Sequence, residues 1–144
     1  MNAEHDAPEP PPEAVLIRRA RQARGLTRAQ AAERSGVVKA SRWGQIENGY
    51  VMKDGAPTPT KAGDMQLAHM AHVVGVAPER LTEAGRGAAA EILGEILDQD
   101  RVYADMSDRL ERTAWEMPLA VEDRKLIIDM LRQAKAQGRG ERSA

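Results

Sequence analysis

The chain has 144 residues, 42% of them hydrophobic and 30% charged, which suits one small domain with an appendage and argues against a disordered chain. It has no Cys, which excludes disulfides, cysteine-ligated zinc and a thiol nucleophile. No stretch is apolar enough to span a membrane and no signal peptide is visible, so we expect a soluble, cytoplasmic protein.

The net charge of −1 conceals an uneven distribution along the chain. Residues 1–13 carry four acids and no base, residues 14–86 carry twelve bases and six acids, and residues 87–144 carry nine bases and twelve acids. A basic centre between acidic flanks favours a module that binds a polyanion such as nucleic acid. An ordinary solvated surface is the alternative explanation.

The first half of the chain is predicted to contain five short helices. Residues 1–13 combine acids with prolines and are expected to form a disordered arm. Helices are predicted over residues 12–24, 28–34 and 39–48, each followed by a glycine that ends it. Residues 50–63, rich in Gly and Pro, are expected to form a loop, and two more helices follow at 64–74 and 78–84.

The second half is predicted to be helical as well. The segment Gly85-Arg86-Gly87 is a candidate hinge, residues 88–117 form one long helix or two, and a last helix covers residues 119–136. No segment alternates as a strand would, so the predicted class is all-α. The predicted organisation is an arm at 1–13, a domain at 14–86, a helical dimerisation or interaction region at 87–137 and a flexible tail at 138–144.

Three segments, in order, carry a family resemblance: LIRRARQARGLTRAQAAERSGV, RWGQIENG and LAHMAHVVGVAPERL. Residues 14–84, about half of the chain, resemble the phage-repressor (Cro/XRE-type) helix-turn-helix family. The resemblance implies a five-helix DNA-binding domain in which the helix at 39–48 is the recognition helix and enters the major groove. This sequence has one more residue between Gly36 and Trp43 than the family pattern, and residues 50–63 are longer than the usual connection.

The resemblance also implies which side chains contact double-stranded DNA. With Trp43 in the core and Glu47 paired to an arginine or capping backbone, Arg42 is expected to bond a guanine and Gln45 an adenine, and Ala40 to touch a thymine methyl. Arg28 and the residues after the recognition helix are expected to contact phosphates. The full predicted set is Arg28, Lys39, Ala40, Ser41, Arg42, Gln45, Asn48, Tyr50 and Lys53.

Two regions leave alternatives open. Residues 50–63 are either a surface insertion or a DNA-contacting wing, with Lys53 and Lys61 as its contacts. Residues 88–136 have an apolar stripe at intervals of three and four, which favours a homodimer interface over a fold-back onto the domain. The residues predicted for that interface are Leu93, Ile96, Leu97, Tyr103, Met106 and Leu110.

The sequence contains no recognisable catalytic constellation. His69 and His72 lie three residues apart but lack a third ligand, so we expect no metal, no cofactor and no enzyme activity. The sequence predicts a sequence-specific transcriptional regulator, a repressor, that binds a palindromic operator as a homodimer. The alternatives are an antitoxin or adaptor that binds a protein partner through residues 88–136, and a non-specific DNA organiser.

Overall fold

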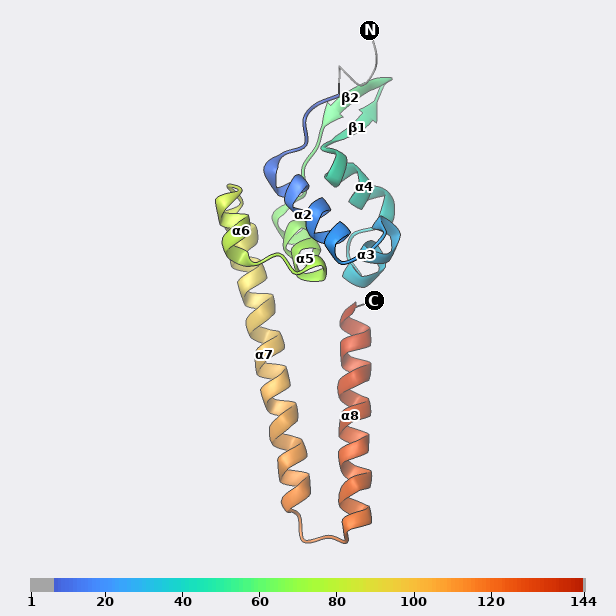
Figure 1. Cartoon of the computed structure of the whole chain (residues 1–144), viewed down its shortest axis with the longest axis vertical. Coiled ribbons are helices and arrows are strands. Elements are labelled where there is room, and N and C mark those ends of the chain that lie inside the picture. Colours follow the sequence, from blue (N-terminus) through green and yellow to red (C-terminus); the bar gives the residue numbers. More distant parts are fainter. Residues whose placement is uncertain (1–6, 144) are drawn as a thin grey trace. The chain divides into compact units, whose positions relative to one another are not determined.

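The computed structural model describes residues 7–143, with side chains described through Gly138, and the described chain contains seven helices and one two-stranded sheet (Figure 1). The mainly helical class and the order of the helices confirm the prediction. The chain divides into two units, residues 1–95 and residues 96–144. None of the helices over the described range is long and apolar enough to cross a membrane.

The first unit contains five complete helices and the sheet (Figure 1). They are α2 (Pro12–Ala23), α3 (Arg28–Ser35), α4 (Ala40–Asn48), β1 (Tyr50–Lys53), β2 (Ala56–Pro59), α5 (Asp64–Val74) and α6 (Pro78–Glu83). The unit ends within the first turns of α7 (Gly87–Glu116), and α8 (Val121–Ser143) belongs to the second unit.

Local sequence signals explain where these helices begin and end. Pro12 occupies the first position of α2, where its missing N–H has no helical partner to lose. Thr27 caps α3, since its hydroxyl accepts from the Gln30 N–H at 3.1 Å while Gln30 Oε1 accepts from the Thr27 N–H at 2.9 Å. Gly36 and Gly49 end α3 and α4 with φ of 67° and 82°, a conformation that other residues adopt only at a cost.

The core of the first unit is built around one large side chain. Trp43 is fully buried, as predicted, and buried alanines on α3 and α5 let these two helices pack closely against each other. Leu81 on α6 and Leu93 in the first turns of α7 are also fully buried. The first compact unit therefore extends to residue 95, in the first turns of α7, whereas the predicted domain boundary lies at residue 86.

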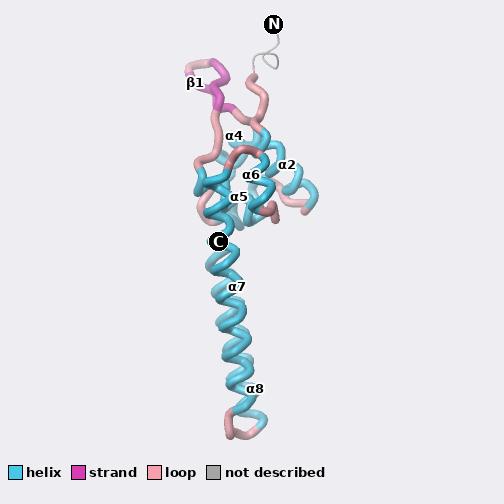
Figure 2. The backbone as a smooth tube through the Cα atoms, turned by 90° about the vertical axis from the view of Figure 1, so that its left-hand side faces the viewer, coloured by secondary structure: helices cyan, strands magenta, loops and turns pink. Residues whose placement is uncertain are grey.

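Residues 50–63 are not the loop that was expected, because they contain a two-stranded antiparallel hairpin (Figure 2). The register pairs Tyr50 with Pro59 and Lys53 with Ala56. Asp54 and Gly55 form the turn with φ of 51° and 76°, and two positive φ values are the geometry that joins strands most tightly. The prolines concealed the strand pattern, but an edge strand tolerates them.

The predicted hinge and part of the predicted arm are packed in the structure. The Arg86 guanidinium donates to Glu13 Oε1 at 2.9 Å and to the Ala62 carbonyl at 2.6 Å, and it lies 3.1 Å from Asp64 Oδ1. Glu13 itself is buried in α2. The segment around Arg86 is thus anchored rather than a free hinge, and the arm joins the fold at its last residues. Residues 1–6 of the predicted arm lie outside the described residues.

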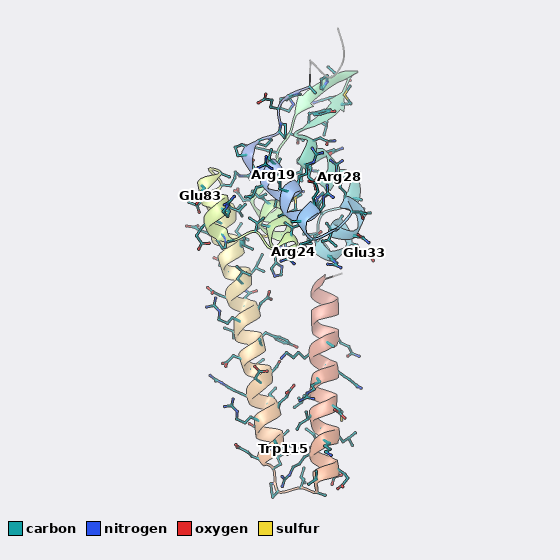
Figure 3. The ribbon with its side chains drawn as sticks, viewed as in Figure 1. Arg19, Arg24, Arg28, Glu33, Glu83 and Trp115 are labelled. Carbon is teal, nitrogen blue, oxygen red and sulfur yellow. The ribbon has the colours of Figure 1, made fainter. Side chains whose placement is uncertain are left out.

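The second unit is an antiparallel pair of helices joined by residues 117–120. Residues 87–116 form one continuous helix, and α8 extends to Ser143 instead of ending near residue 136. Ion pairs link the two helices, Arg132 to Glu111 at 3.5 Å and Lys135 to Asp108 at 3.3 Å. Trp115, near the end of α7, remains half exposed (Figure 3).

Candidate nucleic-acid interface

Helices α3 and α4 and the turn between them form a helix-turn-helix unit. Ser35 holds the turn, because its hydroxyl donates to the Ala32 carbonyl at 2.7 Å and accepts from the Val38 N–H at 3.1 Å. Val38 points into the core, whereas Val37 beside it is 55% exposed. The turn joins Ser35, the last residue of α3, to Ala40, where α4 begins.

The orientation of α4 follows from which of its residues are buried. Trp43, Ile46 and Glu47 face the interior, so residues one helical turn apart on the opposite side, Ser41 and Gln45, face outward. A helix that presents small and amide side chains on one exposed face and packs a tryptophan on the other is suited to contact base edges in a major groove.

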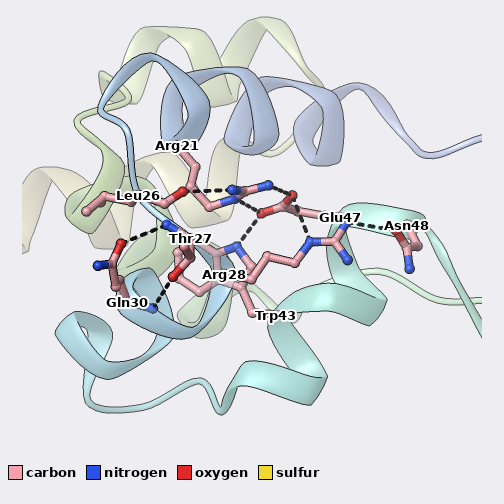
Figure 4. A network of polar contacts seen from close by, with 8 residues as sticks. All are labelled: Arg21, Leu26, Thr27, Arg28, Gln30, Trp43, Glu47 and Asn48. Atoms are coloured by element: carbon pink, nitrogen blue, oxygen red, sulfur yellow. Dashed lines mark hydrogen bonds and ion pairs between the residues drawn. The ribbon is translucent and has the colours of Figure 1, made fainter.

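A buried ion pair fixes α4 to α2 (Figure 4). Both Glu47 carboxylate oxygens accept from Arg21, at 2.7 and 2.8 Å, and the Trp43 indole N–H donates to the same carboxylate. Arg21 also donates to the Leu26 carbonyl at 2.8 Å. The prediction that Glu47 pairs with an arginine is confirmed. The planar Arg21 guanidinium and the planar Glu47 carboxylate are joined by two hydrogen bonds, which restrict the angle between α2 and α4 as well as the distance between them.

The surroundings of Glu47 keep its carboxyl ionised. Burial opposes ionisation, but hydrogen bonds from Arg21 and Trp43, together with the charges of Arg21 and Arg28, outweigh burial and hold the pKa of Glu47 below its ordinary value of 4.5. The hydrogen bond to Glu47 raises the pKa of Arg21 in turn, against the opposing effect of burial. Both partners are therefore charged at neutral pH.

This shift predicts an acid-sensitive first unit. Because the Glu47 pKa is lower in the folded state, its ionisation adds stability that is fully present above pH about 4.5 and is lost as the pH falls through the folded-state value. Urea unfolding at pH 7 and pH 3 should show a larger loss of stability in the wild type than in Glu47→Gln. Equal losses in the two proteins would contradict this assignment.

The predicted DNA contacts at the start of α4 are exposed. Lys39, Ala40 and Ser41 are open to solvent, and Gln45 is half buried. Val37 was not predicted, although it lies in the same exposed stretch. The sequence does offer a sign that Val37 is exposed. Val37 and Val38 are adjacent, and in an extended turn only one of two adjacent side chains can face the core.

Four of the predicted contacts have partners within the protein: Arg28, Arg42, Gln45 and Asn48. Arg28 donates to Asn48 Oδ1 at 2.9 Å and to Glu47 Oε1 at 3.4 Å (Figure 4). Arg42 donates to Thr60 Oγ1 at 2.9 Å, to the Lys61 carbonyl at 3.0 Å and to Gln45 Oε1 at 3.5 Å. A contact from Arg42 to guanine would have to replace these bonds.

The two predicted contacts on β1 differ in exposure. Tyr50, where the strand leaves α4, is half buried, and Lys53 at the tip is exposed. The two strands thus hold an exposed cation beyond the C-terminal end of α4.

The predicted dimer residues fall into two groups. Leu93, one of the predicted dimer residues, is fully buried within the chain, so its side chain is not exposed to a second copy. Ile96 and Tyr103 are half buried, whereas Leu97, Met106 and Leu110 are exposed to 36%, 51% and 48%. The prediction did not include Leu126 and Met130 on α8, each 60% exposed.

No group of three or more metal-ligating side chains is present in the part of the chain that the structure describes. Burial and the neighbouring His72 lower the pKa of His69, which favours the neutral imidazole of that side chain. His69 and His72 are therefore not part of any candidate metal site among the described residues.

Comparison with known proteins assigns the first unit. The model of a family described as a helix-turn-helix domain matches residues 14–84. No curated protein and no solved structure matches the chain. The match covers α2 to α6, including the turn held by Ser35 and the buried face of α4. Through residues 14–84, the chain belongs to the helix-turn-helix family of the Cro/XRE kind.

Proposed function

We propose that the chain is a sequence-specific transcriptional regulator that binds double-stranded DNA through the exposed face of α4. The observation that carries this proposal is the arrangement of α4 itself. Its inner face is held by Trp43 and the Glu47 ion pair, while Ser41 and Gln45 face outward. A rigidly held helix can present these side chains to base edges without a large loss of conformational entropy on binding.

The contacts that we assign to base edges are those of the outer face. The Gln45 amide can donate to and accept from an adenine, the Ser41 hydroxyl can bond several bases, and the Ala40 methyl can contact a thymine methyl. Lys39, at the N-cap of α4, lies where a phosphate would benefit from both its charge and the helix N-terminus.

The charge of the first unit supports DNA as the ligand. Residues 14–86 carry twelve bases against six acids, and two of these charges, Arg21 and Glu47, neutralise each other in the interior. The remaining surface is basic. Its association with DNA should weaken with salt, by about 0.9 logarithmic units per phosphate contact for each tenfold increase in salt concentration.

We further propose that the second unit forms a homodimer. Met106 and Leu110 on α7 and Leu126 and Met130 on α8 are exposed apolar side chains at intervals of four residues. Exposed apolar side chains of this size favour contact with another protein surface. Two helices from each of two copies can bury them in a four-helix arrangement, and two-fold symmetry would match a palindromic operator.

A regulator of this kind needs no catalytic activity. Occupying an operator blocks access of polymerase to the promoter, so we propose repression as its mode of action. A second candidate remains for the second unit, since a cleft of about 620 Å³ between α7 and α8, lined mainly by charged side chains and Trp115, could hold a protein partner. The chain would then be an antitoxin or adaptor.

The experiment that tests the proposed function is affinity purification of fragmented genomic DNA with the purified full-length protein, followed by sequencing. We expect a small set of fragments that share a two-fold symmetric sequence. Uniform recovery of all fragments would support a non-specific DNA organiser, and no recovery would favour the adaptor function, so either result would contradict the proposal.

A further inference from the structure

We propose that the β1–β2 hairpin is a wing that contacts the phosphate backbone of DNA beside the groove that α4 enters. The wing comprises residues 50–59. This inference rests on the DNA-binding function proposed above and extends it, because it assigns the hairpin a part in DNA binding and gives Arg42 a role other than base contact.

The wing is fixed to the recognition helix by three bonds. The Thr60 N–H donates to the Gly49 carbonyl at 2.9 Å, which continues the strand pairing to the end of α4. Arg42 donates from α4 to the Thr60 hydroxyl and to the Lys61 carbonyl, at 2.9 and 3.0 Å. A side chain that reaches from the helix to the strand exit acts as a brace, so the wing and α4 present one rigid surface.

The N-terminal segment also packs against the residue that joins α4 to β1. A Cβ atom on Gly49 would lie only 2.7 Å from the Pro10 Cα, so the backbone of Pro10 packs directly on the residue that joins α4 to β1. The contacts of Pro10 and of Arg42 leave the hairpin little freedom to rotate about Gly49.

One face of the wing has the chemistry of a phosphate-binding surface. The register places Val51 opposite Thr58 and Lys53 opposite Ala56, so these four residues share a face. Thr60, two residues beyond Thr58, lies on the same side. Hydroxyl and ammonium groups are common donors to DNA phosphates.

The same face is continuous with the recognition helix. The Thr60 hydroxyl contacts Arg42, which lies next to Ser41 on the exposed part of α4. A strand of four residues spans about 13 Å, and the major groove is about 12 Å wide. With α4 in the groove, Lys53 at the tip is therefore within reach of the backbone that borders it.

The test measures affinity as a function of salt concentration by fluorescence anisotropy, with the full-length protein. The probes are a labelled duplex with the sequence enriched by the wild type and a scrambled duplex of equal length. The variants are Lys53→Ala, Lys53→Arg and Arg42→Met. Arg80→Ala is the matched control, because it removes an exposed cation from α6, on the opposite side of the unit from α4 (Figure 1).

We expect Lys53→Ala to weaken binding to both duplexes alike and to reduce the slope of log affinity against log salt by about 0.9. Lys53→Arg should retain the slope. Arg42→Met should weaken binding to both duplexes, because it releases the wing from α4. Arg80→Ala should have the wild-type slope.

Two results would overturn the wing. One is a Lys53→Ala slope equal to that of Arg80→Ala on both duplexes. The other is wild-type affinity for both duplexes in Arg42→Met, which would mean that bracing the wing against α4 does not contribute to binding. Failure of the proposed function is seen separately, as equal wild-type affinity for the two duplexes. The wing can still be judged in that case, since its slope is measured on the scrambled duplex as well.

Discussion

Glu47→Gln is expected to lower the free energy of unfolding of the first unit by about 3–5 kcal/mol, the cost of leaving one member of a buried ion pair without its partner. The carboxylate is 1% exposed and accepts two bonds from Arg21. An uncharged amide cannot balance the guanidinium, which would remain in the interior. This is a large part of the stability of a small domain.

Urea unfolding followed by Trp43 fluorescence, in a Trp115→Phe background, measures this loss. Glu33→Gln is the control, because Glu33 is an exposed glutamate on α3 (Figure 3). We expect a change within about 0.5 kcal/mol for this surface substitution. A loss below about 1 kcal/mol in Glu47→Gln would mean that the ion pair does not hold α4 against α2, and the rigid recognition helix would lose its physical basis.

Met106→Ser combined with Leu110→Ser is expected to convert a dimer to a monomer and to lower operator affinity by about 10²- to 10⁴-fold. Both side chains are about half exposed on α7, and their apolar surface would be covered in the proposed dimer. A monomer contacts each half-site independently and loses the advantage of a second linked contact, which accounts for a factor of this size.

Analytical ultracentrifugation and operator titration measure the two effects. Asp105→Ser combined with Arg109→Ser is the control, because it removes an exposed ion pair of 3.0 Å from the same stretch of α7 and leaves the net charge unchanged. It should alter neither property. A wild-type protein that is monomeric at all concentrations would contradict the dimer and favour a protein partner for the second unit.

The helix ends in the first unit could be predicted because local chemistry determines them. Pro12, the Thr27 cap and the glycines after α3, α4 and α5 act within a few residues of their own positions. The burial of Trp43 was predictable for a similar reason, because helical spacing places it with Ile46.

Contacts between distant residues could not be predicted from the sequence. Arg42 reaches Thr60 and Lys61 only because the hairpin folds back beside α4, and the hairpin was concealed by its prolines. The choice of Arg21 as the main partner of Glu47, rather than a neighbouring arginine, depends on how α2 crosses α4. Leu93 has the helical spacing of the residues predicted for the dimer interface, but its side chain is buried in the core of the first unit.

The measurement that tests the central claim most directly is base preference in a random duplex library, compared between the wild type and Gln45→Ala. We predict that Gln45→Ala relaxes preference at one base pair in each half-site, at a cost of about 1–3 kcal/mol for the preferred base. The control Gln22→Ala, which truncates an exposed glutamine on α2, should keep the wild-type preference. An unchanged preference in Gln45→Ala would contradict the claim that the outer face of α4 contacts the bases.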